Sequence, residues 1–136
     1  MCIRSLATGY CPDPSPLEGG YYDMFGFPLC TLQDFLEGFA ADDHFGRTGK
    51  AMYVSAAMDP KCALHNRTIT VLEIDREYGQ HVPVRVCDTG EAFEGKGTSR
   101  IDLCCRCGDD PATGAPYMNA DLVNGHVTLS LEEEQL

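Results

Sequence analysis

The sequence predicts a mainly β fold, a small barrel or sandwich with long loops. Residues 82–87 alternate, with Val82, Val84 and Val86 on one face, which is typical of a half-buried strand. The other apolar segments are also short, and only residues 31–37 favour a helix. The chain lacks the strand–helix alternation that builds a parallel α/β sheet, so an all-β architecture is expected.

The expected elements follow one another at short intervals. Thr31 can cap the helix over residues 31–37, with Asp34 at its third position and Gly38 at its end, and Leu32, Phe35 and Leu36 as its buried face. Asp59-Pro60 stops the strand that precedes it. We expect a polar turn at residues 75–80, and strands near residues 7–11, 52–58, 68–74, 82–87, 101–103 and 126–131.

Length and charge limit the classes of function. At 136 residues, the chain is expected to be one domain over residues 1–136. The net charge of −11 argues against nucleic acid and against an anionic membrane surface as partners. No apolar run approaches the roughly 20 residues of a membrane span. No signal peptide is visible, which leaves open a cytosolic protein, another export route or a module of a longer chain.

Eight cysteines are many for an intracellular chain of this length. Their even number permits a disulfide set, and free buried thiols are equally compatible with the sequence. Cys104-x-x-Cys107 with Cys87 raises the alternative of zinc, but a structural zinc site usually has two such paired knuckles. The four histidines form no ligand pattern, so neither a metal nor another cofactor is expected.

Residues 82–103 have the pattern of a functional site. A strand delivers Asp88 into an acidic, glycine-rich loop, and Asp102 follows between Ile101 and Leu103. Partial burial beside aliphatic side chains raises the pKa of a carboxyl group, which is what a general acid requires.

Three aspartate-bearing segments around this stretch resemble a known family. They are S-A-A-M-D-P at residues 55–60, V-C-D-T-G-E-A-F-E-G-K-G at 86–97 and R-I-D-L at 100–103. Together they resemble the three-aspartate (3D) domain, which is similar to the barrel of lytic transglycosylases of the membrane-bound A type. Expansins and family-45 endoglucanases are more distant relatives. The resemblance implies a six-stranded double-psi β-barrel with one or two short helices, its core at about residues 50–131 plus the first strand, and an insertion at about 12–49.

The resemblance also implies an activity. Lytic transglycosylases cleave the β-1,4 bond between N-acetylmuramic acid and N-acetylglucosamine in peptidoglycan, leaving a 1,6-anhydro product without using water. One carboxyl group can serve as acid and then as base in that reaction. We expect Asp102 in this role, Asp88 as a second or orienting carboxylate, and Asp59 as the third of the set.

Further residues are candidates for substrate binding, although each also has a simpler interpretation as a turn former, a solvated side chain or a packing residue. They are Lys96, Thr89 and Gly90 in the central loop, Tyr10 on the first strand, and Glu18 and Asp23 in the insertion. The expected partner is the glycan strand of peptidoglycan at the cell envelope, and the expected state is a monomer.

Two other functions stay open. The barrel can be a non-catalytic carbohydrate-binding or structural module, associated with a virion or a cell wall. It can also be a hydrolytic glycosidase that uses Asp88 and Asp102 as base and acid. Glu91 beside the proposed acid, the cysteines after Asp102 and the negative charge of the chain all depart from what the resemblance suggests.

Overall fold

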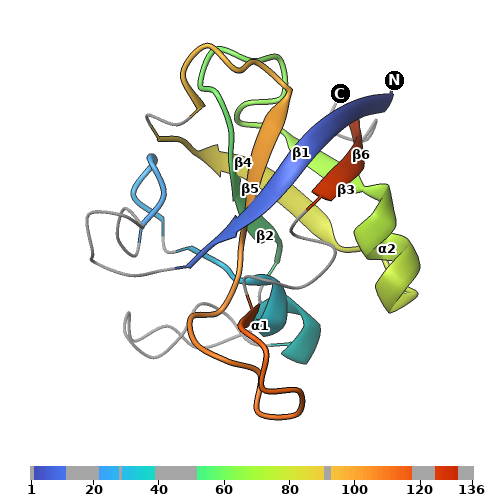
Figure 1. The fold of residues 1–136 in the computed structure, drawn as a ribbon. Coiled ribbons are helices and arrows are strands. Elements are labelled where there is room, and N and C mark those ends of the chain that lie inside the picture. The colour runs from blue at the N-terminus through green and yellow to red at the C-terminus, as the bar shows by residue number, and fades with distance from the viewer. Residues whose placement is uncertain are drawn as a thin grey trace.

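The chain forms a closed six-stranded β-barrel (Figure 1) in a computed structural model that describes residues 2–11, 22–27, 29–38, 52–90, 93–117 and 125–131. Around the barrel the strands follow the order β1-β5-β2-β4-β3-β6, and β6 pairs with β1 to close it. Their bounds are β1 (Cys2–Tyr10), β2 (Val54–Ala57), β3 (Thr68–Val71), β4 (Pro83–Asp88), β5 (Arg100–Cys104) and β6 (Gly125–Leu131). The mainly β prediction is confirmed, and the first strand begins earlier than expected.

The barrel is mixed. β1 runs parallel to β5, and β2 runs parallel to β4. The remaining neighbours, including β1 with β6 and β2 with β5, are antiparallel. Parallel neighbours cannot be joined by a tight turn, so long connections between strands are required.

Two faces of the strands are buried in different ways. Alternate residues such as Ala7, Ala56 and Leu103 point into the main core of the barrel, where they are 0% exposed. The opposite face of β1, β5 and β2 carries a second, smaller apolar cluster made of Tyr10, Leu29, Ala57, Phe93 and Cys104. We call this second group the outer cluster.

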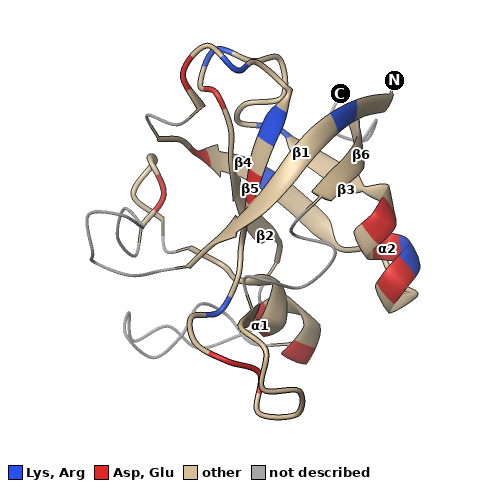
Figure 2. Cartoon of the chain, in the orientation of Figure 1, with Lys and Arg blue, Asp and Glu red and all other residues tan. Residues whose placement is uncertain are grey.

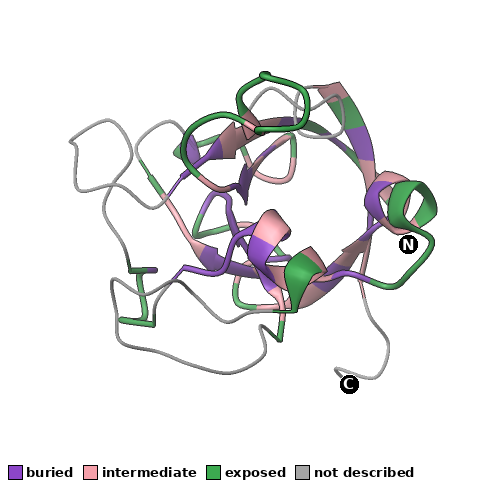
Figure 3. Cartoon of the chain, turned by 90° about the horizontal axis from the view of Figure 1, so that it is seen from below, coloured by how far each residue is buried: buried purple, intermediate pink, exposed green. Residues whose placement is uncertain are grey.

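Helix α1 (Leu32–Glu37) lies at one end of the barrel, as the view from below in Figure 3 shows. The expected cap is confirmed, because the Thr31 side chain accepts a hydrogen bond from the Asp34 N–H at 3.0 Å and Gly38 ends the helix at φ 84°. Leu32 is buried in the main core, and Phe35 and Leu36 pack against it. The helix therefore closes one end of the barrel.

The polar turn expected at residues 75–80 is wrong, because a second helix, α2 (Leu72–Tyr78), begins where β3 ends. Only Ile74 of this helix is fully buried, so its sequence lacks a broad apolar face. Glu73 and Asp75 in the first turn favour a helix N-terminus, and Gly79 ends the helix in the left-handed region. These local signals outweigh the polar composition that favoured a turn.

The cysteines are used for a crosslink and for packing. Cys11 and Cys107 form a disulfide that ties the end of β1 to the loop after β5. Burial raises the pKa of the Cys87 and Cys105 thiols to about 12, so both stay protonated at neutral pH. Within the described ranges, no group of three or more His, Cys, Asp or Glu is placed to hold a metal ion, and Cys107 of the zinc alternative is already bridged.

Charged groups are distributed unevenly over the chain. Figure 2 shows acidic positions on both helices and in loops, with the basic positions spread over separate elements. In the part of the chain that the structure describes, no helix has the length and apolar character needed to cross a membrane.

Candidate functional site

Two of the three predicted catalytic aspartates lie in one row across the barrel wall. The pairing registers place residues of four neighbouring strands opposite one another in the order Thr8, Asp102, Ala57 and Asp88. Residues in register on adjacent strands point to the same face of a sheet. We call this set the carboxylate row, and it lies on the face of the outer cluster.

A β-bulge places Asp88 in this row. Val86 of β4 lies opposite Ala56 of β2, but the next residue of β2, Ala57, lies opposite Asp88 and not Cys87. Cys87 is therefore the extra residue, and without it Asp88 would face the other way. The Met58 N–H donates to the Asp88 carbonyl at 3.2 Å and fixes the strand beyond the bulge.

The Asp88 carboxyl group is half-buried, and its environment favours the protonated form. Burial, followed by the nearby negative charge of Asp23, raises its pKa to about 6. The N–H groups of Thr89 and Met24 and the Tyr10 hydroxyl act in the opposite direction and limit the rise. Asp88 can therefore hold a proton in mildly acidic solution and release it near neutral pH.

Asp102 is also half-buried, and it accepts a hydrogen bond from the Thr8 hydroxyl. Its aliphatic neighbours Ile101 and Leu103 do not surround it, because successive residues of a strand point to opposite faces and both belong to the main core. Ala57 separates Asp102 from Asp88, so the two Cα atoms are two strand spacings apart, roughly 10 Å.

Asp23 lies close to the carboxylate row, in the turn at residues 22–27. Its side chain is 6% exposed, and its Oδ1 accepts hydrogen bonds from the N–H groups of Phe25 and Phe27 at 2.8 and 3.0 Å. The turn lies beside the end of β4, where the Met24 N–H donates to the Cys87 carbonyl at 3.3 Å (Figure 1). Asp23 therefore lies close to Asp88, and its role in substrate binding stays a prediction.

Tyr10 belongs to the outer cluster and is 7% exposed. Its hydroxyl meets no partner with hydrogen-bond geometry, although it lies near enough to Asp88 to lower the pKa of that carboxyl group. Burial, together with the charges of Cys104, Asp88, Cys87 and Asp102, raises the pKa of Tyr10 well above its usual value. The phenol is therefore a neutral polar group near both carboxyl groups.

The third predicted aspartate, Asp59, has a different environment. Its two oxygens accept hydrogen bonds from the N–H groups of Lys61 at 3.0 Å and Gly97 at 2.9 Å, and these bonds lower its pKa. Asp59 therefore stays ionised and anchors the loop at residues 93–99. Lys96 of that loop is exposed.

The remaining candidates are less closely tied to the row. Thr89 follows Asp88 directly, and its hydroxyl oxygen is buried without a hydrogen-bond partner, whereas Gly90 is exposed. Glu18 lies outside the described residues.

Two polar residues of this face were not predicted as site residues from the sequence. Thr8 became visible as a partner of Asp102 only through the parallel register of β1 and β5. Arg100 lies two residues before Asp102 on the same strand, with its guanidinium carbon 5.7 Å from the centre of the Phe93 ring. Period-two alternation within residues 100–104 would have placed Arg100 on the Asp102 face.

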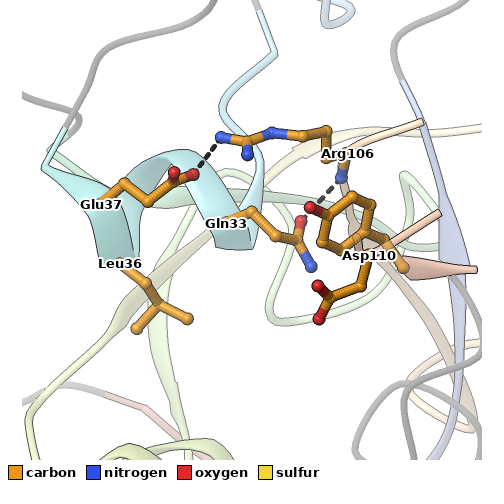
Figure 4. Close-up of a pocket in the computed structure, with 6 residues that line it drawn as sticks. Gln33, Leu36, Glu37, Arg106 and Asp110 are labelled. Atoms are coloured by element: carbon orange, nitrogen blue, oxygen red, sulfur yellow. Dashed lines mark hydrogen bonds and ion pairs between the residues drawn. The ribbon is translucent and has the colours of Figure 1, made fainter. Parts of the chain in front are cut away.

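A cavity of about 180 Å³ lies between α1 and the loop after β5 (Figure 4), apart from the carboxylate row. It is lined by Gln33, Leu36, Glu37, Arg106, Asp110 and Tyr117. Arg106 is already paired, because its guanidinium binds Asp34 at 2.6 Å and also Glu37, while its backbone N–H donates to Gln33. These contacts hold the loop against α1 and explain the cavity as a packing feature.

Comparisons with known proteins identified no relative, since no family model, no curated protein and no solved structure matches the chain.

Proposed function

We propose that this protein cleaves glycan strands as a lytic transglycosylase, acting on the bond between N-acetylmuramic acid and N-acetylglucosamine in peptidoglycan. The observation that carries the proposal is the Asp88 carboxyl group, which sits half-buried at a strand end with its pKa raised to about 6 and Asp102 in the same row. Glycoside cleavage needs a carboxyl group that is protonated near the working pH, and Asp88 meets that need.

The proposal also relates the fold to a known family. A closed six-stranded barrel with parallel β1/β5 and β2/β4 pairs is compatible with a double-psi β-barrel of the three-aspartate family. In this view the D-T-G segment begins at the bulge that turns Asp88 to the outer face, and R-I-D-L is β5 with Asp102 on that same face.

The chemistry follows from the two protonation states of Asp88. The protonated carboxyl group gives its proton to the glycosidic oxygen while the bond from C1 to that oxygen breaks. The resulting carboxylate then takes the proton of the muramyl C6 hydroxyl as its oxygen bonds to C1, which closes the 1,6-anhydro ring. Asp102, oriented by the Thr8 hydroxyl, supplies a negative charge that stabilises the positive centre at C1.

A hydrolytic glycosidase is the second candidate, favoured by the gap between the two aspartates. Their Cα atoms are roughly 10 Å apart, and carboxyl groups about 6.5–9.5 Å apart leave room for a water molecule in inverting hydrolases. In that reaction Asp102 acts as the base that activates water.

Mass spectrometry of the products from purified sacculi tests the proposal. We expect anhydro-muropeptides from the wild type, and a rate at least about 100-fold lower for Asp88→Asn, because general acid catalysis contributes about 10²–10⁴-fold. Asp109→Asn, which removes an exposed carboxylate in another loop, is the control and should keep full activity. New reducing ends would identify the hydrolase, and glycan binding without any product would identify a non-catalytic module.

A further inference from the structure

The turn at residues 22–27 combines a buried centre with an apolar exterior. Four large apolar side chains of this turn are between 42% and 52% exposed, namely Tyr22, Met24, Phe25 and Phe27. Exposed apolar groups gathered on one short segment mark an interaction site more often than scattered ones do. Elsewhere among the described residues, large exposed apolar side chains such as Met52 and Tyr78 occur singly along the chain.

The shape of the turn is fixed from within. The Asp23 N–H donates to the Phe27 carbonyl at 2.8 Å, and the Gly26 N–H donates to the Asp23 carbonyl at 3.1 Å. Together with the two bonds that Asp23 Oδ1 accepts, these contacts hold the backbone in one conformation. Rigid presentation lowers the entropic cost of binding for the side chains that the turn exposes.

Polar atoms without partners lie under the turn. Asp23 Oδ2 is buried and makes no hydrogen bond, and the buried Tyr10 hydroxyl, although close to Asp88, has no partner with ordinary hydrogen-bond geometry. Both residues are more than nine-tenths buried. Tyr10 packs with Leu29, two residues beyond the turn. A buried acceptor without a donor destabilises the folded protein. The exposed side chains of the turn can move aside for a ligand. If that ligand brings hydroxyl or amide donors to the buried acceptors, it offsets part of this unfavourable burial.

The negative charge near the turn limits the kinds of ligand that can bind there. Asp23 and Asp88 lie beneath the turn, so an anionic membrane or a nucleic acid would be repelled. A ring with one apolar face and several hydroxyl donors matches both the aromatic exterior and the acceptors below. Resting on the proposed function, we propose that residues 22–27 form a sugar-binding subsite in which Phe25 and Phe27 stack on a neutral pyranose ring held next to Asp88.

Binding of N-acetylglucosamine oligomers to the full chain tests this subsite. The measurements use calorimetry or NMR titration in an Asp88→Asn background, which prevents turnover. We expect Phe25→Ala/Phe27→Ala to weaken binding about tenfold or more, because the variant lacks both rings that stack on the sugar. Tyr78→Ala, which removes an exposed ring on α2, is the matched control and should bind like its parent.

A second variant separates stacking from general apolar contact. Phe27→Leu keeps an apolar side chain without a ring, so sugar binding should fall, while Phe27→Tyr should restore it. Unchanged binding in the double alanine variant would overturn the proposal, as would an Asp88→Asn parent that binds no oligomer. Binding of the turn to zwitterionic phosphatidylcholine vesicles, with equal strength in Phe27→Leu, would also overturn it and would assign the surface to a membrane.

The result is independent of catalysis. If the wild type releases no product from sacculi, but the double variant binds oligomers more weakly than its parent, the subsite stands and the transglycosylase proposal fails. If cleavage is normal and the double variant binds oligomers as tightly as its parent, the subsite fails and the transglycosylase proposal stands.

Discussion

At the scale of single residues, Asp88 couples the proposed chemistry to stability. Its pKa in the folded protein is raised to about 6 from 3.8, chiefly by burial, so the folded state binds this proton more tightly than the unfolded state does. The stabilising contribution of that proton is complete below the unfolded pKa and disappears as the pH rises through about 6.

Asp88→Asn should therefore remove a cost that builds up as the pH rises from 3.8 to about 6 and is complete above that value. We expect the variant to be more stable than the wild type at pH 8 by about 1–2 kcal/mol, a value reduced to allow for the partial exposure of the group. At pH 4, where the wild-type carboxyl group is protonated, the two proteins should unfold at similar urea concentrations. Equal stability at pH 8 would show that Asp88 is not held in an unfavourable environment.

Candidate site residues could be predicted from the sequence where a strand or turn pattern indicated their position. Asp88 and Asp102 were proposed because each adjoins an apolar strand, and the strand registers place both on the same face, while their catalytic roles stay predictions. The burial of Asp102 by its aliphatic neighbours was a wrong inference, since the pleat turns those neighbours away. The β-bulge at Cys87 has no sequence signature, so the orientation of Asp88 could not be predicted.

At the scale of elements, Glu73 joins helix α2 to strand β6. Its carboxylate accepts hydrogen bonds from the Thr128 N–H at 2.7 Å and the Thr128 hydroxyl at 2.9 Å. Burial raises the pKa of Glu73, but these bonds and the charge of Arg4 outweigh burial and lower the pKa overall.

Glu73→Gln should destabilise the protein in a pH-dependent way. A lowered folded pKa gives a contribution that is present above the unfolded value of 4.5 and is lost as the pH falls through the folded pKa. We expect a loss of about 1–2 kcal/mol in the free energy of unfolding at pH 7 and a smaller loss at pH 3. Urea denaturation measures both, with the exposed Glu77→Gln as control. A loss of equal size at both pH values would contradict the charge-based account.

Helix α2 was not predicted from the sequence. Residues 68–74 alternate like a strand, and nothing in that pattern marks Val71 as the last strand residue. Helix α1 was predictable because its cap residues act locally, as the Thr31 hydrogen bond confirms. The Asp34 carboxylate, however, pairs with Arg106, a contact between distant segments that local spacing could not reveal.

At the scale of the whole molecule, the net charge of −11 opposes an anionic substrate such as peptidoglycan. Salt screens that repulsion, because the Debye length falls from about 30 Å at 0.01 M to about 10 Å at 0.1 M ionic strength. We expect kcat/KM on sacculi to rise several-fold between these conditions, whereas binding of neutral oligomers should stay constant. A fall in kcat/KM with salt would indicate attraction and a local basic contact.

The sequence predicted that six short strands would form a mainly β fold, but the order of those strands was beyond pattern reasoning. Alternation specifies which face of a strand is buried, and it carries no information about which strand is its neighbour. The disulfide partner of Cys107 was undetermined for the same reason, because Cys11 comes close to it only after β1 and β5 pair.

The position of β1 between β5 and β6 has a consequence for how the protein is made. Leu6 lies opposite both Arg100 and His126, so β1 can pair with its two neighbours only after the intervening barrel strands have been synthesised. Contacts between such distant segments slow folding, since the entropy of closing the chain is lost before they form. Until β5 and β6 leave the ribosome, β1 has two open edges that a neighbouring nascent chain can pair with, so this protein is expected to need a chaperone that shields its first strand.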